Sequence, residues 1–180
     1  MTKGPDAMIR FPQLQAAQDD LLALCGRSLE GRPLADRAGH ADELCRRATV
    51  LTQVREEVVH PWLVDRLPAA AHDLAVIEFD LVRVLVHELV ASRPRDLMYD
   101  ALVESLCRLL RRRFEAEVGP AGEWTTLAPD ACREVDDIAA ARLRALDEAG
   151  QGGHWTPLQP YALESLRSAI PAGAILWSDL

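Results

Sequence analysis

Apolar residues recur every three or four positions along most of the chain, which is the spacing of one face of an α-helix. The most regular run covers residues 44–63, LCRRATVLTQVREEVVHPWL. Its predicted apolar face consists of Leu44, Ala48, Leu51, Val58 and Trp62. Arg55 falls on the same face, so we expect this run to place an arginine in the protein core.

The same periodicity predicts further helices over residues 14–24, 69–91, 96–118 and 129–148, with residues 26–43 expected as a loop that holds at most a short helical piece. The third predicted helix aligns His72, Ala75, Phe79, Val82 and Val86. The fourth aligns Leu102, Leu106, Leu109, Arg113 and Glu117, so charge again follows apolar residues inward. No segment shows a strand pattern. We therefore predict an all-α, up-down bundle of four long helices followed by a short fifth helix.

A chain of 180 residues is long enough for one domain and short for two. Three glycines, Gly150, Gly152 and Gly153, separate the predicted bundle, residues 1–149, from a C-terminal extension, residues 150–180. In this extension we expect a short helix over residues 161–170 and then an apolar run over residues 174–177. It is expected to pack on the bundle or on a partner.

The formal net charge of −8 argues against a general nucleic-acid or anionic-membrane binder. No apolar run approaches the roughly 20 residues that span a bilayer, and the first residues lack the apolar core of a secretion signal. We therefore expect a cytoplasmic protein with neither nucleic-acid nor membrane partners. The four cysteines are widely spaced in the predicted helices, which favours buried free thiols over a zinc site.

Several of these segments together resemble the hemerythrin-like, HHE cation-binding family of four-helix bundles, over roughly residues 6–147. Residues 44–63 are similar to the second-helix block of that family, and residues 78–83 to the start of its third-helix ligand segment. Residues 99–101 and 111–119 are similar to its fourth-helix block. The resemblance implies a bundle built around a di-iron centre.

Most metal ligands of the family are absent at the matching positions. The resemblance places its histidines at Gln15, Leu51, Phe79, Arg112 and Arg113, and a bridging glutamate at Arg55. Glu117 alone keeps a ligand-type side chain. Because iron needs nitrogen and carboxylate donors within about 2.2 Å, these residues predict a protein without a metal or other cofactor.

The substitutions suggest that a guanidinium takes over the positive charge of the metals, so we expect Arg55 to pair with Glu117 in the core. Two interpretations remain for Arg113. The simpler one is that its side chain reaches solvent at the end of the bundle. The other is that it is buried without a partner and awaits an anionic group of a ligand.

The leading functional hypothesis is therefore a metal-free protein in which the former di-iron centre is a pocket for a small organic molecule, with an anionic or carbonyl-bearing one favoured. The predicted pocket-lining residues are Gln15, Gln18, Leu51, Arg55, Phe79, Arg113 and Glu117. Catalysis without a cofactor would use Arg55 or Arg113 to polarise an oxygen and His72 to move a proton. For His72 the competing interpretation is a structural histidine near the end of the bundle.

Two other classes of function remain open. One is a non-catalytic interaction or regulatory protein with a filled core, in which the C-terminal extension forms a homodimer or partner contact. The other is a metalloprotein with relocated ligands drawn from His72, His87 and nearby Asp80 or Glu78. The pocket hypothesis requires a connected cavity lined by Leu51, Phe79 and Arg113.

Overall fold

The computed structural model describes residues 10–27, 31–118, 122–150 and 155–161, and within these residues the protein is all-α. Its helices are α1 (Pro12–Cys25), α2 (Leu34–Val54), α3 (His60–Leu63), α4 (Ala69–Ala91), α5 (Tyr99–Val118) and α6 (Pro129–Gly150). A π-helical turn, Arg55–Val59, joins α2 to α3, and a 3-10 turn, Glu123–Thr126, precedes α6.

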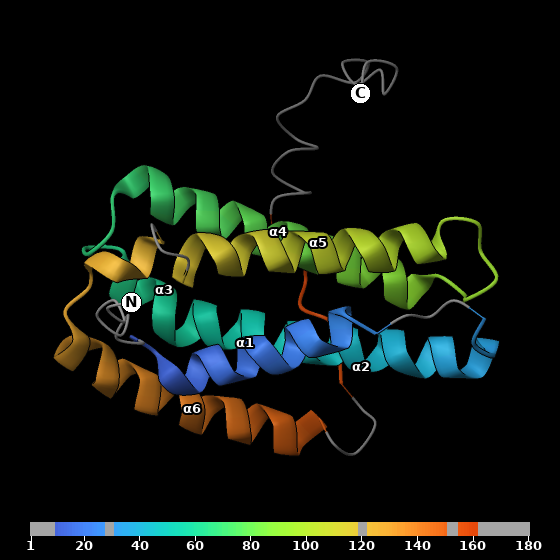
Figure 1. Ribbon diagram of the computed structural model, residues 1–180, viewed down its shortest axis with the longest axis horizontal. Helices are drawn as coiled ribbons and strands as arrows, with labels where there is room; N and C mark the ends of the chain where they lie inside the picture. Colours follow the sequence, from blue (N-terminus) through green and yellow to red (C-terminus); the bar gives the residue numbers. More distant parts are fainter. Residues whose placement is uncertain (1–9, 28–30, 119–121, 151–154, 162–180) are drawn as a thin grey trace, which may run out of the picture.

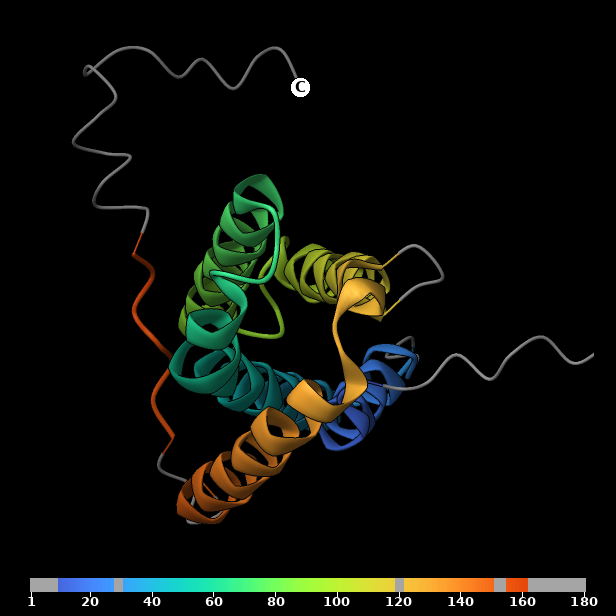
Figure 2. The same cartoon turned by 90° about the vertical axis from the view of Figure 1, so that its left-hand side faces the viewer.

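Four helices pack in a closed ring, with α1 against α2, α2 against α4, α4 against α5 and α5 against α1. Successive long helices run in alternating directions (Figure 1). The sixth helix, α6, lies outside this ring against α1 and α2. Figure 2, which looks along the helices, shows α6 projecting from the side on which α1 and α2 lie.

Two expectations about the helices are wrong. The second helix begins at Leu34, ten residues earlier than expected, because Pro33 ends the preceding loop and the glycine at position 39 is tolerated inside a packed helix. The fifth long helix, α6, is not short, since it has 22 residues against 14 for α1. Its burial against two helices stabilises this length.

The π-helical turn changes which residues of the second predicted helix face the core. The amide of His60 donates to the carbonyl of Arg55, five residues earlier, so one extra residue is accommodated in this turn. Val59 and Leu63 are therefore fully buried, whereas Val58 and Trp62, the residues expected there, are only partly buried. Arg55 precedes the extra residue and keeps its predicted inward position.

The core runs the length of the ring and is made of the inward faces of all the long helices. The predicted inward residues Ala75, Phe79, Val82 and Val86 of α4 are buried, as are Leu106, Arg113 and Glu117 of α5. Eleven of the described polar or charged residues are buried as well, and several of them gather at one place. None of the described helices combines the length and apolar character that crossing a membrane requires.

Candidate functional site

Arg55 and Glu117 form a buried ion pair between the π-helical turn and α5. The Arg55 side chain has no exposed surface and that of Glu117 is 3% exposed. Arg55 Nε donates to Glu117 Oε1 at 3.2 Å and Nη2 donates to Oε2 at 2.5 Å. This two-bond geometry matches the planar guanidinium to the planar carboxylate, and it confirms the pairing that the sequence predicts.

Gln18 of α1 completes the contacts of this carboxylate. Its Nε2 donates to Glu117 Oε2 at 2.6 Å, and its side chain is fully buried. Three nearby buried atoms, Gln18 Oε1, Arg55 Nη1 and Thr52 Oγ1, have no hydrogen-bond partner among the described residues. Buried polar atoms of this kind are ordinarily satisfied by a bound water molecule.

Arg113 is buried and paired, so both interpretations of it from the sequence are wrong. Its side chain is 1% exposed, Nη1 donates to Glu78 Oε2 at 3.1 Å, and Nη2 donates to Glu123. Its Nε lies 3.6 Å from Glu117 Oε1. Arg113 cannot extend to solvent because three carboxylates from α4, α5 and the 3-10 turn surround it.

The charges of this buried network nearly balance. Burial acts to lower the pKa of Arg113, but Glu117 and Glu123 outweigh it, so the pKa is raised and the side chain stays charged. Burial raises the pKa of Glu123, and Arg113 opposes that rise. Arg112, which is mostly exposed, donates to Glu78 Oε1 at 2.6 Å and connects the network to the surface.

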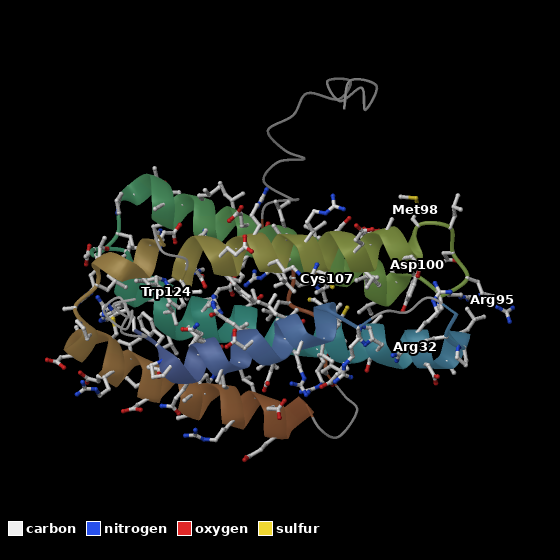
Figure 3. All side chains as sticks on the ribbon, viewed as in Figure 1. Arg32, Arg95, Met98, Asp100, Cys107 and Trp124 are labelled. Carbon is white, nitrogen blue, oxygen red and sulfur yellow. The ribbon has the colours of Figure 1, made fainter. Side chains whose placement is uncertain are left out.

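Aromatic rings occupy the space around the Arg55 guanidinium. Its Cζ lies 4.8 Å from the ring centroid of Phe79, 5.1 Å from that of Phe114 and 5.7 Å from that of Trp124. Ring faces attract a cation, most strongly when water is excluded. The ring centroid of Trp124 also lies 4.7 Å from that of Phe11. Trp124 lies at one end of the bundle (Figure 3), where its ring covers the network.

The pocket hypothesis requires a cavity lined by Leu51, Phe79 and Arg113, and the four cavities described for this structure lie elsewhere. Cavities of about 640, 440, 220 and 150 Å³ are lined neither by Phe79 nor by Arg113. Leu51 is buried in α2 and lines the 440 Å³ cavity between α1, α2 and α6. Gln15 is half-buried on α1, one turn before Gln18. The bundle centre is therefore an ion-pair network among aromatic rings.

His72 lies outside the network, on the far side of His60. The His60 ring is 5.8 Å from the ring of His72 and 5.6 Å from that of Phe79. Burial, followed by the charge of Arg55, lowers the pKa of His60 to about 3, so this imidazole is neutral. His60 thus separates the proposed proton-moving residue from the arginine that it was expected to serve.

The residues suggested for a relocated metal site are held apart. His72 and His87 are fifteen positions apart on α4, which is about 22 Å along a helix. His87 bonds to the carbonyl of Leu158 at 2.9 Å. Among the described residues, no three histidine, cysteine or acidic side chains gather closely enough to hold a metal ion.

Sequence reasoning missed several members of the buried network. Glu78 was considered as a metal ligand and not as a partner of Arg113, and Phe114 was not considered for the core. Glu123 and Trp124 belong to the 3-10 turn after α5, where helical periodicity carries no information. The one available signal was the inward position of Arg113, because a buried cation requires nearby carboxylates.

A second site, the basic cavity, lies near the other end of the bundle between α1, α2 and α5. We define it by its volume of about 640 Å³ and by its cationic lining residues Arg27, Arg32, Arg37, His40 and Arg111. Two carboxylates, Asp100 and Glu104, and two thiols, Cys25 and Cys107, also line it. Arg32, Asp100 and Cys107 are labelled in Figure 3.

Some of these cations are already paired and others are not. Arg37 forms an ion pair with Asp100, and Arg111 donates to the carbonyl of Cys25 at 2.7 Å. The guanidinium groups of Arg27 and Arg32 have no ion-pair partner among the described residues. Burial, followed by the charges of Arg27 and Arg32, lowers the pKa of His40. The four arginines of the lining outnumber its two carboxylates, Asp100 and Glu104.

The thiols in this cavity interact with each other. A side-chain hydrogen bond between Cys25 and Cys107 raises the pKa of Cys25 and lowers that of Cys107. Arg111 lowers both pKa values through its charge.

Comparison of the chain with protein-family models, with curated proteins and with solved structures finds no match.

Proposed function

We propose that this protein binds a small anionic molecule in the basic cavity, without a metal or other cofactor. The observation that carries the proposal is the gathering of four arginines and a histidine around one cavity in a chain of net charge −8. The class of ligand is the one expected from the sequence. We place it in the basic cavity and not at the bundle centre, where the Arg55–Glu117 pair and its aromatic rings lie.

Size and chemistry support a small organic anion. A volume of about 640 Å³ lies within the range of cavities that hold metabolite-sized ligands. Guanidinium groups recognise carboxylates and phosphates through paired hydrogen bonds. Arg27 and Arg32 line the cavity and could each donate such a pair to a bound anion. The surrounding negative charge of the protein disfavours a polyanion such as a nucleic acid, whose length would extend beyond the cavity.

The proposal includes a hemerythrin-like arrangement of α1, α2, α4 and α5 that dispenses with iron. Its support is the ring packing of these helices and the position of Arg55 and Glu117, which the family resemblance aligns with two bridging carboxylates. In this interpretation the ion-pair network holds the helices together where metal ligands would otherwise do so. The working site is then free to lie elsewhere.

The test is a titration with inorganic phosphate, citrate and adenosine monophosphate at low ionic strength, on protein from which metal ions have been removed with a chelating resin. At least one of them should raise the melting temperature in a concentration-dependent manner, because a ligand stabilises the state that it binds. Arg27→Gln and Arg32→Gln should each weaken its binding in isothermal titration by about tenfold, the loss expected for one charged hydrogen bond.

Arg133→Gln is the matched control, because Arg133 is equally exposed but lies on α6, away from the basic cavity. It should leave the affinity unchanged. The proposal is wrong if none of the three anions stabilises the protein, or if Arg133→Gln weakens binding as much as Arg32→Gln does. Binding that is lost when metal ions are removed and returns when they are added back would contradict the metal-free mechanism.

A further inference from the structure

Residues 155–161, which we call the strap, lie along α4 and are held there mainly through their backbone. His87 Nε2 bonds to the carbonyl of Leu158 at 2.9 Å, and Arg83 Nη1 donates to the carbonyl of Gln159 at 3.0 Å. The amide of Tyr161 donates to Asp80 Oδ1 at 2.7 Å. Figure 2 shows the strap as the orange-red segment that passes beside α2 and α4.

The three residues that hold the strap form one face of α4. Asp80, Arg83 and His87 are separated by three and four positions, so they lie in line on the helix. Arg83 also forms an ion pair with Glu56 of the π-helical turn, which faces it from the neighbouring element. Asp80 and Arg83 are 6% and 3% exposed, which makes them buried charged residues in a groove at the surface.

Two side chains of the strap add to the backbone contacts. The ring of Tyr161 lies over Arg83, with Cζ 4.0 Å from the ring centroid. Trp155 Nε1 donates to Asp42 of α2 at 3.1 Å. We call the surface formed by Asp42, Glu56, Asp80, Arg83 and His87 the α2–α4 groove.

The α2–α4 groove therefore recognises features that many extended peptides share. Its residues bind two carbonyls and one amide of the backbone, together with an aromatic ring at the end of the segment. The strap has proline at positions 157 and 160. Proline favours the extended polyproline conformation and lowers the conformational entropy that a peptide loses on binding.

We propose that the α2–α4 groove is a binding site for an extended segment of a partner protein that carries an aromatic residue directly after a proline, and that the strap is its internal competitor. The sequence PLQPY at positions 157–161 shows the kind of segment that fits. Recognition through shared backbone groups and charge-assisted hydrogen bonds allows a foreign segment to replace the strap. This site is separate from the basic cavity, and neither proposal depends on the other.

The strap competes as a tethered ligand. A segment linked to its site by a short connection acts at an effective concentration on the order of millimolar. A free peptide should therefore bind the wild-type protein weakly and bind more tightly when the strap is disabled. The full-length variant Trp155→Ala/Tyr161→Ala removes both side-chain contacts of the strap and leaves every residue of the groove unchanged.

The probe is a fluorescein-labelled peptide with the sequence of residues 155–161, and the readout is fluorescence anisotropy. We expect it to bind the double variant at least about tenfold more tightly than the wild type, because the tethered competitor is weakened. Adding His87→Ala to the double variant should weaken the peptide again. Glycine in place of both prolines of the peptide should also weaken it, because the free peptide is then less ordered.

Arg93→Ala in the double variant is the control for His87→Ala, because Arg93 is exposed just beyond α4 and contacts Asp96 instead of the strap. It should leave peptide binding unchanged. Equal affinity of the peptide for the wild type and the double variant, or no binding to either, would overturn the proposal. A wild-type dimer that the peptide dissociates would also overturn it, since the natural occupant would then be the strap of a second copy.

Discussion

Arg55 shows how a charged side chain is accommodated in a helical core. It is held by two bonds to Glu117 and by three aromatic rings, so both its charge and its flat faces are matched. The cost of removing such a pair from water cancels much of its electrostatic attraction. The pair is therefore a weak source of net stability, but either member alone is a buried, unmatched charge.

A double-mutant cycle tests this arrangement. Arg55→Met should lower the free energy of unfolding by about 3 to 5 kcal/mol, because Glu117 then keeps only Gln18 and the more distant Arg113 as partners. Arg55→Met/Glu117→Leu should be less destabilised than Arg55→Met, since no lone carboxylate remains and Arg113 keeps Glu78 and Glu123. Urea denaturation measures both changes. Equal losses for the single and double variants would show that the two charges do not depend on each other.

His60 makes the stability depend on pH. Its folded pKa is about 3, below the ordinary value of 6.5, so the unfolded chain binds more protons between these two values. Stability is thus fully present above pH 6.5 and is lost progressively as the pH falls toward 3. Between pH 7 and 5.5 this one residue should lower the free energy of unfolding by about 1.2 kcal/mol.

His60→Gln should remove that part of the pH dependence, measured by urea denaturation at pH 7 and pH 5.5. His72→Gln serves as the control, because it removes a neighbouring imidazole and leaves His60 in place. An unchanged pH dependence in His60→Gln would assign the acid sensitivity to other groups.

The π-helical turn determines how two parts of one long helix face the core. Regular helical spacing after Arg55 would bury positions 58 and 62, whereas the turn buries Val59 and Leu63. This shift by one position is what a single inserted residue produces. The turn thus allows Arg55 to reach Glu117 while Val59, His60 and Leu63 fill the end of the core.

Deleting Glu57 should convert the π-helical turn into a regular one and keep the same residues buried. The cost should stay below about 2 kcal/mol, because Glu57 is exposed and its deletion removes only its surface ion pair with Arg142 and its hydrogen bond from Gln53. Deleting Ser105, an exposed residue inside the regular helix α5, should instead rotate Arg113 and Glu117 out of the network and abolish cooperative unfolding. Circular dichroism during thermal unfolding measures the melting temperature and the cooperativity of unfolding of both deletion variants. Similar damage from the two deletions would mean that the turn does not hold an extra residue.

Across the molecule, charge is distributed unevenly. The overall charge is −8, yet arginines surround the basic cavity near one end while the Arg55–Glu117 network lies toward the other, where Trp124 covers it (Figure 3). The strap adds a third region along α2 and α4. Binding, internal support and peptide recognition would thus be served by separate parts of the same bundle.

The sequence predicted the helices well where apolar spacing was regular. The helix at residues 69–91 has the predicted bounds. Helices α1 and α5 end at Cys25 and Val118, the residues directly before a glycine in the sequence. The early start of α2 was missed, since a polar, glycine-containing segment becomes helical only when packing supports it, whereas α6 has nearly the predicted bounds. Of the candidate site, Gln18, Arg55, Phe79, Arg113 and Glu117 do come together.

The amino-acid sequence by itself determined the all-α fold class, the inward position of Arg55 and its pairing with Glu117. The first two follow from helical spacing, which is a local property, and the pairing follows from the resemblance to hemerythrin-like bundles, which aligns Arg55 and Glu117 with two bridging carboxylates. Only the tertiary structure decided the partners of Arg113, the position of the basic cavity and the α4 residues that hold the strap. Those features join residues that are distant in the sequence, and their distances depend on how the helices pack and on the one-residue shift at the π-helical turn.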